Sequence, residues 1–128
     1  MLKYDPASPP NPDTWLEADE GVRIMAVEAW HKQERVELPK AKLHAVIHTI
    51  VENQIASKLD PVVRAMSRLA KEGLSRHDSL HAVGWVLALH LHDMFANPPD
   101  EGAETVNARY LAAVERLTAK AWRAQEDV

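Results

Sequence analysis

The sequence predicts an all-α protein: a single compact bundle of about five helices with a proline-rich N-terminal arm. Three observations predict this fold. Prolines divide the chain of 128 residues into segments, apolar residues recur at helical spacing between them, and no useful length of chain alternates apolar and polar residues as a half-buried strand does. The length and the 46% hydrophobic content are typical of one globular domain.

The N-terminal arm is the first element. Four of the eight prolines lie in the first twelve residues, and both proline and the residue before it disfavour helix. We therefore expect residues 1–13 to form an extended arm and residues 14–128 to form one helical domain. Thr14 and Glu17 have the spacing of a capping box, which indicates a turn before the first long helix.

Local signals place five helices at about 19–33, 39–58, 60–72, 75–96 and 103–125. Pro39 and Pro61 suit the first turn of a helix. Gly73 is a typical stop signal, and Ser75 is a typical N-cap for the helix that follows. The last helix is predicted from apolar residues at helical spacing on one face.

The predicted helices at 39–58 and 75–96 are the most apolar in the chain. A helix without a polar face belongs in the middle of a bundle, so we expect both to be largely buried. Gly84 and Ala88 share one face of the later helix, where a neighbouring helix can approach closely.

Composition excludes several classes of protein. The net charge of −4 argues against nucleic-acid binding. Without cysteine there are no disulfides or thiolate zinc sites, and four scattered glycines exclude a phosphate loop, so no nucleotide cofactor is expected. The longest stretch without charged residues is too short to cross a membrane, and no secretory signal is evident. The cytoplasm is the expected location.

Histidine carries the candidate site. His44 and His48 are four residues apart on one predicted helix, and His77 and His81 are four apart on another. This spacing is about one helical turn, so each pair projects from one face and could chelate a metal ion. Random placement of seven histidines would give roughly 0.4 such pairs. We expect the two helices to pack together with the imidazoles of the two pairs facing each other.

Two carboxylates are candidate additional ligands. Glu52 follows His48 by four residues, and Glu28 stands three residues before His31, the Glu-x-x-His spacing that di-iron bundles use. Zinc, iron, nickel and manganese are all compatible with this set. In a metal-dependent hydrolase Glu52 would act as the general base; a redox role is also open.

Simpler interpretations stay open. Paired histidines on buried helices also serve as structural hydrogen-bonding groups. The segment with Glu28 and His31 is typical of a solvated helix face, because Lys32 and Glu34 lie nearby.

The rival class of function is a non-catalytic interaction or oligomerisation module whose histidines are structural. An exposed apolar face on the last helix, around Tyr110, Leu117 and Trp122, would favour it. A homo-oligomer is compatible with either interpretation.

Two strings carry a family resemblance: HAVIHTIVENQIA from His44 to Ala56, and RLAKEGLSRHDSLHAVG from Arg68 to Gly84. They resemble a family of small bacterial proteins of unknown function, over about residues 15–95. The resemblance implies that both histidine pairs belong to the family's signature strings. It implies no activity, and it leaves the choice between a metal site and a structural role open.

Overall fold

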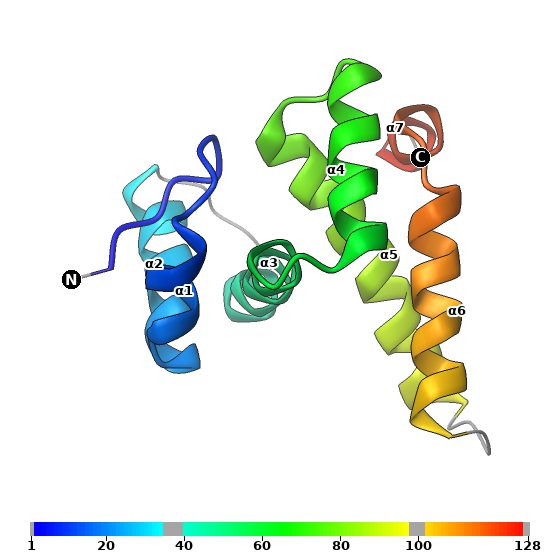
Figure 1. Ribbon diagram of the computed structural model, residues 1–128, viewed down its shortest axis with the longest axis horizontal. Helices are drawn as coiled ribbons and strands as arrows, with labels where there is room; N and C mark the ends of the chain where they lie inside the picture. The colour runs from blue at the N-terminus through cyan, green and yellow to red at the C-terminus, as the bar shows by residue number, and fades with distance from the viewer. Residues whose placement is uncertain (1, 35–39, 98–101, 127–128) are drawn as a thin grey trace.

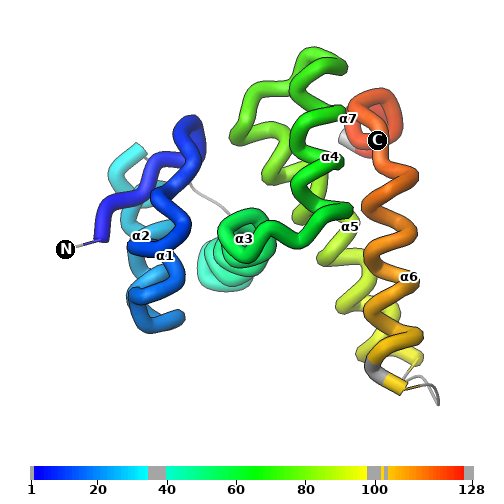
Figure 2. Tube along the Cα trace, viewed as in Figure 1, coloured from blue at the N-terminus to red at the C-terminus, as the bar shows by residue number. Residues whose placement is uncertain are grey.

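The computed structural model describes residues 2–34, 40–97 and 102–126. These residues are all-helical, as predicted (Figure 1, Figure 2). The described part contains seven helices rather than about five: α1 (Pro12–Glu17), α2 (Glu20–Gln33), α3 (Ala41–Ala56), α4 (Asp60–Lys71), α5 (Arg76–Ala96), α6 (Ala103–Arg116) and α7 (Ala119–Glu126). Helices α2 to α5 correspond to the first four predicted helices, although residue 39 lies outside the described residues.

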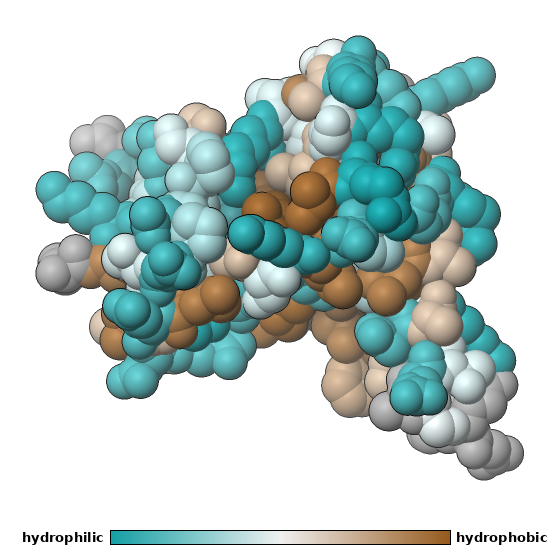
Figure 3. Space-filling view, in the orientation of Figure 1, coloured by the Kyte–Doolittle hydropathy of each residue, from teal (hydrophilic) through white to brown (hydrophobic). Residues whose placement is uncertain are grey.

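Helix α3 lies between two groups of helices. In Figure 1 it is seen end-on, with α1, α2 and the N-terminal segment on one side and α4 to α7 on the other. Buried apolar side chains follow this division. One cluster contains residues of the N-terminal segment, α1 and α2 together with Ala45 of α3. A larger cluster contains residues of α3, α4, α5, α6 and α7. On the face shown in Figure 3, apolar residues appear mainly where α3 and α4 adjoin.

The first additional helix, α1, begins earlier than the predicted turn. The side chain of Asn11 accepts a hydrogen bond from the backbone N–H of Thr14 at 3.1 Å, so Asn11 is the N-cap. Pro12 then occupies the first turn, where its missing N–H costs nothing. The capping box expected from Thr14 and Glu17 is therefore replaced by a cap three residues upstream.

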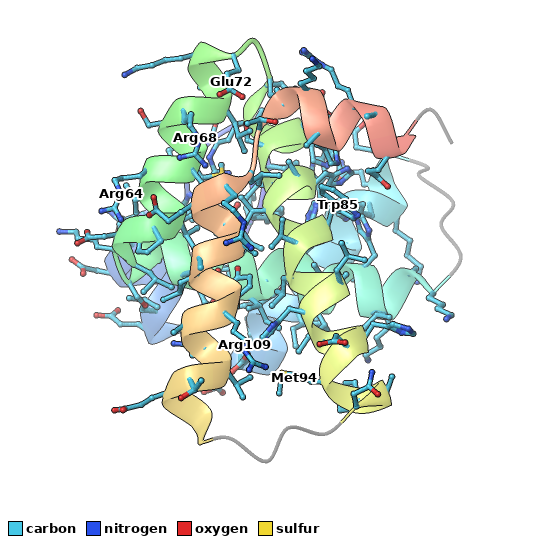
Figure 4. All side chains as sticks on the ribbon, turned by 90° about the vertical axis from the view of Figure 1, so that its right-hand side faces the viewer. Arg64, Arg68, Glu72, Trp85, Met94 and Arg109 are labelled. Carbon is cyan, nitrogen blue, oxygen red and sulfur yellow. The ribbon has the colours of Figure 1, made fainter. Side chains whose placement is uncertain are left out.

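The second additional helix arises because the predicted last helix is broken. Leu117 is extended (φ −64°, ψ 134°), and two side chains hold the break: Arg68 of α4 and Glu72, the C-cap residue of α4. Arg68 donates to the carbonyl oxygens of Val114 and Leu117 at 2.9 and 3.0 Å, and Glu72 accepts from the backbone N–H of Ala119 at 2.7 Å. Figure 4 shows Arg68 and Glu72 near the C-terminal end of α4, beside the point where α6 gives way to α7.

The turn between α4 and α5 depends on glycine. Gly73 has φ 99°, a conformation that L side chains rarely adopt. The backbone N–H of Leu74 bonds to the carbonyl of Leu69 at 3.1 Å, which closes α4. Ser75 then caps α5 by accepting from the N–H of Asp78, as predicted.

Helix α5 is buried only in its first half. Leu80, Val83 and Gly84 are buried, whereas Leu89 and Phe95 are exposed. The expectation that the whole helix lies inside a bundle is therefore wrong for its C-terminal end. A Cβ at Gly84 would lie 3.0 Å from Cγ2 of Ile47, so glycine allows α3 and α5 to pack closely. No helix in the described part of the chain is both long and apolar enough to span a membrane.

The N-terminal segment is anchored to the helices rather than separate from them. Tyr4 is buried against Trp15, with ring centroids 5.6 Å apart, and its hydroxyl donates to Oε2 of Glu52 at 2.7 Å. Arg76 also binds Glu52, through two hydrogen bonds of 2.7 and 2.8 Å, and donates to the carbonyl of Pro6. This network joins the N-terminal segment, α3 and the start of α5.

Removing the carboxylate charge of Glu52 should be strongly destabilising. Its side chain is fully buried and that of Arg76 is 17% exposed, so Glu52→Gln leaves a buried guanidinium without its counter-charge. We expect a loss of about 3–5 kcal/mol in the free energy of unfolding, measured by urea denaturation.

Glu115→Gln is the matched control, because Glu115 pairs with Arg64 on the surface, where both side chains are exposed. It should cost less than about 1 kcal/mol. Equal losses in the two variants would contradict the assignment of a structural role to the buried pair.

Candidate metal site

Five histidines converge where α2, α3 and α5 meet. His31 comes from the last turn of α2, and the two predicted pairs come from α3 and from the first turns of α5. The rings of His44 and His48 lie 4.6 Å apart by centroid, and those of His77 and His81 lie 4.5 Å apart. The sequence therefore brings together three segments that are far apart in the chain.

His48 is at the centre of the cluster. Its ring centroid lies 4.6 to 5.4 Å from those of the other four histidines, and it is 1% exposed. The rings of His44 and His48 are 5.0 and 4.8 Å from that of His81. The predicted packing of the two pairs against each other is confirmed.

Four of the five histidines form the closest group of donor atoms. One ring nitrogen from each of His31, His44, His48 and His81 lies within 4.8 Å of the others. His77 lies beside this group and makes an edge contact with Trp30, with ring centroids 5.1 Å apart. His31, which the sequence analysis did not count among the ligands, belongs to this group of four, whereas His77 does not.

The nitrogen atoms of this cluster are buried without hydrogen-bond partners. Among the described residues, every buried side-chain nitrogen or oxygen atom without a partner belongs to these five histidines. They are Nε2 of each ring and, in His48, Nδ1 as well. Because a buried polar group without a partner costs free energy, the cluster is incomplete as a structural hydrogen-bonding network.

His31 shows how one ring is oriented. Its Nδ1 lies 2.8 Å from the carbonyl oxygen of Val27, one turn earlier on α2. A carbonyl only accepts, so Nδ1 carries the proton and Nε2 presents its lone pair to the cluster. Metal-binding histidines are commonly oriented by this kind of second hydrogen bond.

Side chains of α3 also hold α2 in place. Asn53 accepts hydrogen bonds from Nε1 of Trp15 at 2.8 Å and from Arg23 of α2 at 3.0 Å. Arg23 in turn donates to the carbonyls of Leu16 and Ala18. These bonds fix the angle at which α2 brings His31 to the cluster.

The two candidate carboxylates lie outside the group of donor atoms. Both oxygens of Glu52 are engaged by Arg76, and Tyr4 donates to one of them. Burial first, and then the Glu52 carboxylate, raise the pKa of Tyr4 well above its ordinary value, so the hydroxyl remains a donor. Glu52 is therefore engaged elsewhere and is poorly suited to act as a general base. Glu28 is half-buried and is not among the grouped ligands.

The interpretation of the segment around His31 as a solvated face is wrong for His31 itself, which is 6% exposed. The spacing of residues on α2 could have indicated this burial. His31 follows the buried Val27 by four residues, so both lie on the same side of α2. The neighbouring Lys32 and Glu34 are exposed, as expected.

The surroundings favour the neutral form of His44, His48, His77 and His81. Burial, followed by the charges of neighbouring histidines, lowers the pKa of His44 to about 4, that of His48 to about 2 and that of His81 to about 3. Burial also lowers the pKa of His77, against the opposing effect of Asp78 and Asp5. Neutral imidazole is the form that binds metal ions.

The apolar face that would have favoured an interaction module is not exposed. Tyr110, Leu117 and Trp122 are 3%, 4% and 5% exposed and belong to the larger hydrophobic cluster. These three residues pack within the chain, so they offer no surface to a partner.

Comparison with protein-family models, with curated proteins and with solved structures finds no match. The argument for function therefore depends on the geometry and chemistry of the histidine cluster.

The metal-free protein should lose stability as the pH falls below the ordinary histidine pKa of 6.5. The folded-state pKa values of His44, His48 and His81 lie near 4, 2 and 3, so the unfolded chain binds protons first. Stability is fully present above pH 6.5 and declines below it. Each such proton contributes about 1.4 kcal/mol per pH unit to the slope, measured by urea denaturation between about pH 7 and pH 5.

His48→Leu should reduce this slope by about 1.4 kcal/mol per pH unit, the contribution of one proton. The reason is that it removes one histidine whose pKa is lowered in the folded state. His92→Leu is the control: His92 is exposed on α5, and its removal should leave the slope unchanged. A metal-free protein whose stability is the same at both ends of this range would contradict the buried neutral cluster.

Proposed function

We propose that the protein binds one transition-metal ion through His31, His44, His48 and His81, with His77 as a neighbouring fifth imidazole. The observation that carries the proposal is the concentration of unpartnered buried nitrogen atoms in this one cluster. A metal ion would provide several of these atoms with a partner at once.

The geometry is near that of a four-coordinate site. With metal–nitrogen bonds of ~2.0–2.1 Å, ligand atoms in a tetrahedron lie about 3.3–3.4 Å apart. The four nitrogens here lie within 4.8 Å of one another. Small side-chain rotations, without rearrangement of the helices, would therefore bring them into coordination.

The donor set narrows the metals proposed from sequence. Imidazole nitrogen suits zinc, nickel and iron, whereas manganese prefers carboxylate oxygen. The four grouped ligands are all histidines, and Glu52 is bound to Arg76. Zinc, nickel and iron are therefore favoured over manganese.

A structural role for the histidines is the competing explanation. It would require the ring nitrogens to hydrogen-bond to one another or to the backbone, but among the described residues Nδ1 of His31 is the one ring nitrogen of the cluster that bonds to a backbone carbonyl. The absence of partners at the centre of the cluster, on both nitrogens of His48, favours the metal site.

Zinc titration of chelator-treated protein should show one ion bound per chain by calorimetry. Binding should also stabilise the fold, because the ion binds the folded state preferentially: about 2.7 kcal/mol at a free zinc concentration one hundred times Kd. The melting temperature should rise accordingly, and a chelator should reverse the rise.

His48→Ala should abolish zinc binding at this site, because His48 is central, and His77→Ala should weaken it less. His92→Ala, on the exposed end of α5, should leave zinc affinity unchanged. A melting temperature indifferent to zinc and chelator, together with additive losses for His44→Ala and His81→Ala, would overturn the proposal.

A further inference from the structure

A pocket opens beside the histidine cluster, between α3, α5 and α7. Its volume is about 370 Å³, and it is lined by His44, His48 and His81 and by mostly apolar side chains, among them Ile47, Trp85 and Ala88. Figure 4 labels Trp85 on α5. This volume lies within the range of ~300–1,000 Å³ that is usual for small-molecule sites.

The pocket reaches three of the four proposed metal ligands. The remaining lining residues are mostly apolar. A ligand here would therefore have an apolar body next to Trp85 and Ile47 and a polar end at the histidines. Such a distribution is typical of sites that bind a mainly apolar molecule through a few polar groups.

The charge around the metal site determines which polar group of a ligand would bind there. A divalent ion held by neutral imidazoles keeps its full positive charge, and the grouped ligands include no carboxylate. Glu52 is neutralised by Arg76, and Asp5 and Asp78 act on His77, outside the group of four. Among the described residues that line the pocket, the charged side chain is that of Lys40. An anion is therefore the complementary ligand.

We propose that this pocket binds a small organic carboxylate, with its apolar body against Ile47 and Trp85 and its carboxylate at the ion held by the histidine cluster. This inference rests on the proposed metal site and adds the chemical class of its ligand. Carboxylate oxygen is an ordinary ligand of zinc, and zinc can take it as a fifth ligand in addition to the four nitrogens. Lys40 would add a second favourable charge.

The first test uses phenylacetate as the probe and phenylacetamide as its neutral counterpart of the same shape. Calorimetric titration of the zinc-loaded full chain should give binding of phenylacetate at least about tenfold tighter than of phenylacetamide, because only the acid carries charge to the ion. In chelator-treated protein this preference should fall to about twofold or less, the share left to Lys40.

Two pairs of variants locate the binding. Ala88→Phe fills the pocket from α5 and should weaken phenylacetate binding at least about tenfold, whereas Ala96→Phe places the same side chain on the exposed end of that helix and should not. Lys40→Gln should weaken it about twofold, and Lys42→Gln, which does not line the pocket, should have no effect. Zinc stoichiometry measured on each variant shows that the fold and the cluster are intact.

The outcomes separate the two proposals. If zinc binds but the acid and the amide bind equally, or neither binds, the carboxylate inference is overturned and the metal site stands. Phenylacetate binding that survives Ala88→Phe unchanged also overturns it, because the probe then lies elsewhere. If zinc does not bind, the metal site fails and the inference that depends on it fails with it.

Discussion

Desolvation of imidazole nitrogen is the constraint around which this structure is arranged. Five rings from three helices are brought out of water at one junction, and their Nε2 atoms have no partner there. In water each nitrogen would be hydrogen-bonded, so folding gives up those bonds without replacing them. A fold that tolerates this cost requires strong packing elsewhere, which the clusters on both sides of α3 provide. A bound ion would remove the cost.

The charged side chains of Glu52 and Arg76 lie near the histidine cluster but pair with each other. Glu52 lies one turn from His48 on α3, and Arg76 immediately precedes His77 on α5, yet these two side chains bind each other. The ion pair fixes α3 against the start of α5 and so fixes the distance between the histidine pairs. It also withdraws the nearest buried carboxylate on α3 from the cluster. The grouped donors are therefore imidazole nitrogens alone, a set that suits zinc, nickel or iron better than manganese.

Sequence patterns predicted the structural features that are set by residues close together in the chain. The histidine pairs were found because a spacing of four residues places side chains on one helix face, and Gly73 and Ser75 marked the turn before α5 correctly. Features set by distant residues were not predictable in this way. His31 joins the cluster because Asn53 of α3 holds α2 in place, and the last helix breaks because Arg68 of α4 binds its backbone at Leu117.

X-ray absorption spectroscopy of the zinc-loaded protein tests the metal site most directly. The account predicts a first shell of nitrogen or oxygen atoms at ~2.0–2.1 Å, with outer-shell scattering from about four imidazole rings. His48→Ala should remove this signature. A shell made mainly of water oxygens, with one imidazole or none, would show that zinc binds adventitiously and that the buried histidines have a structural role.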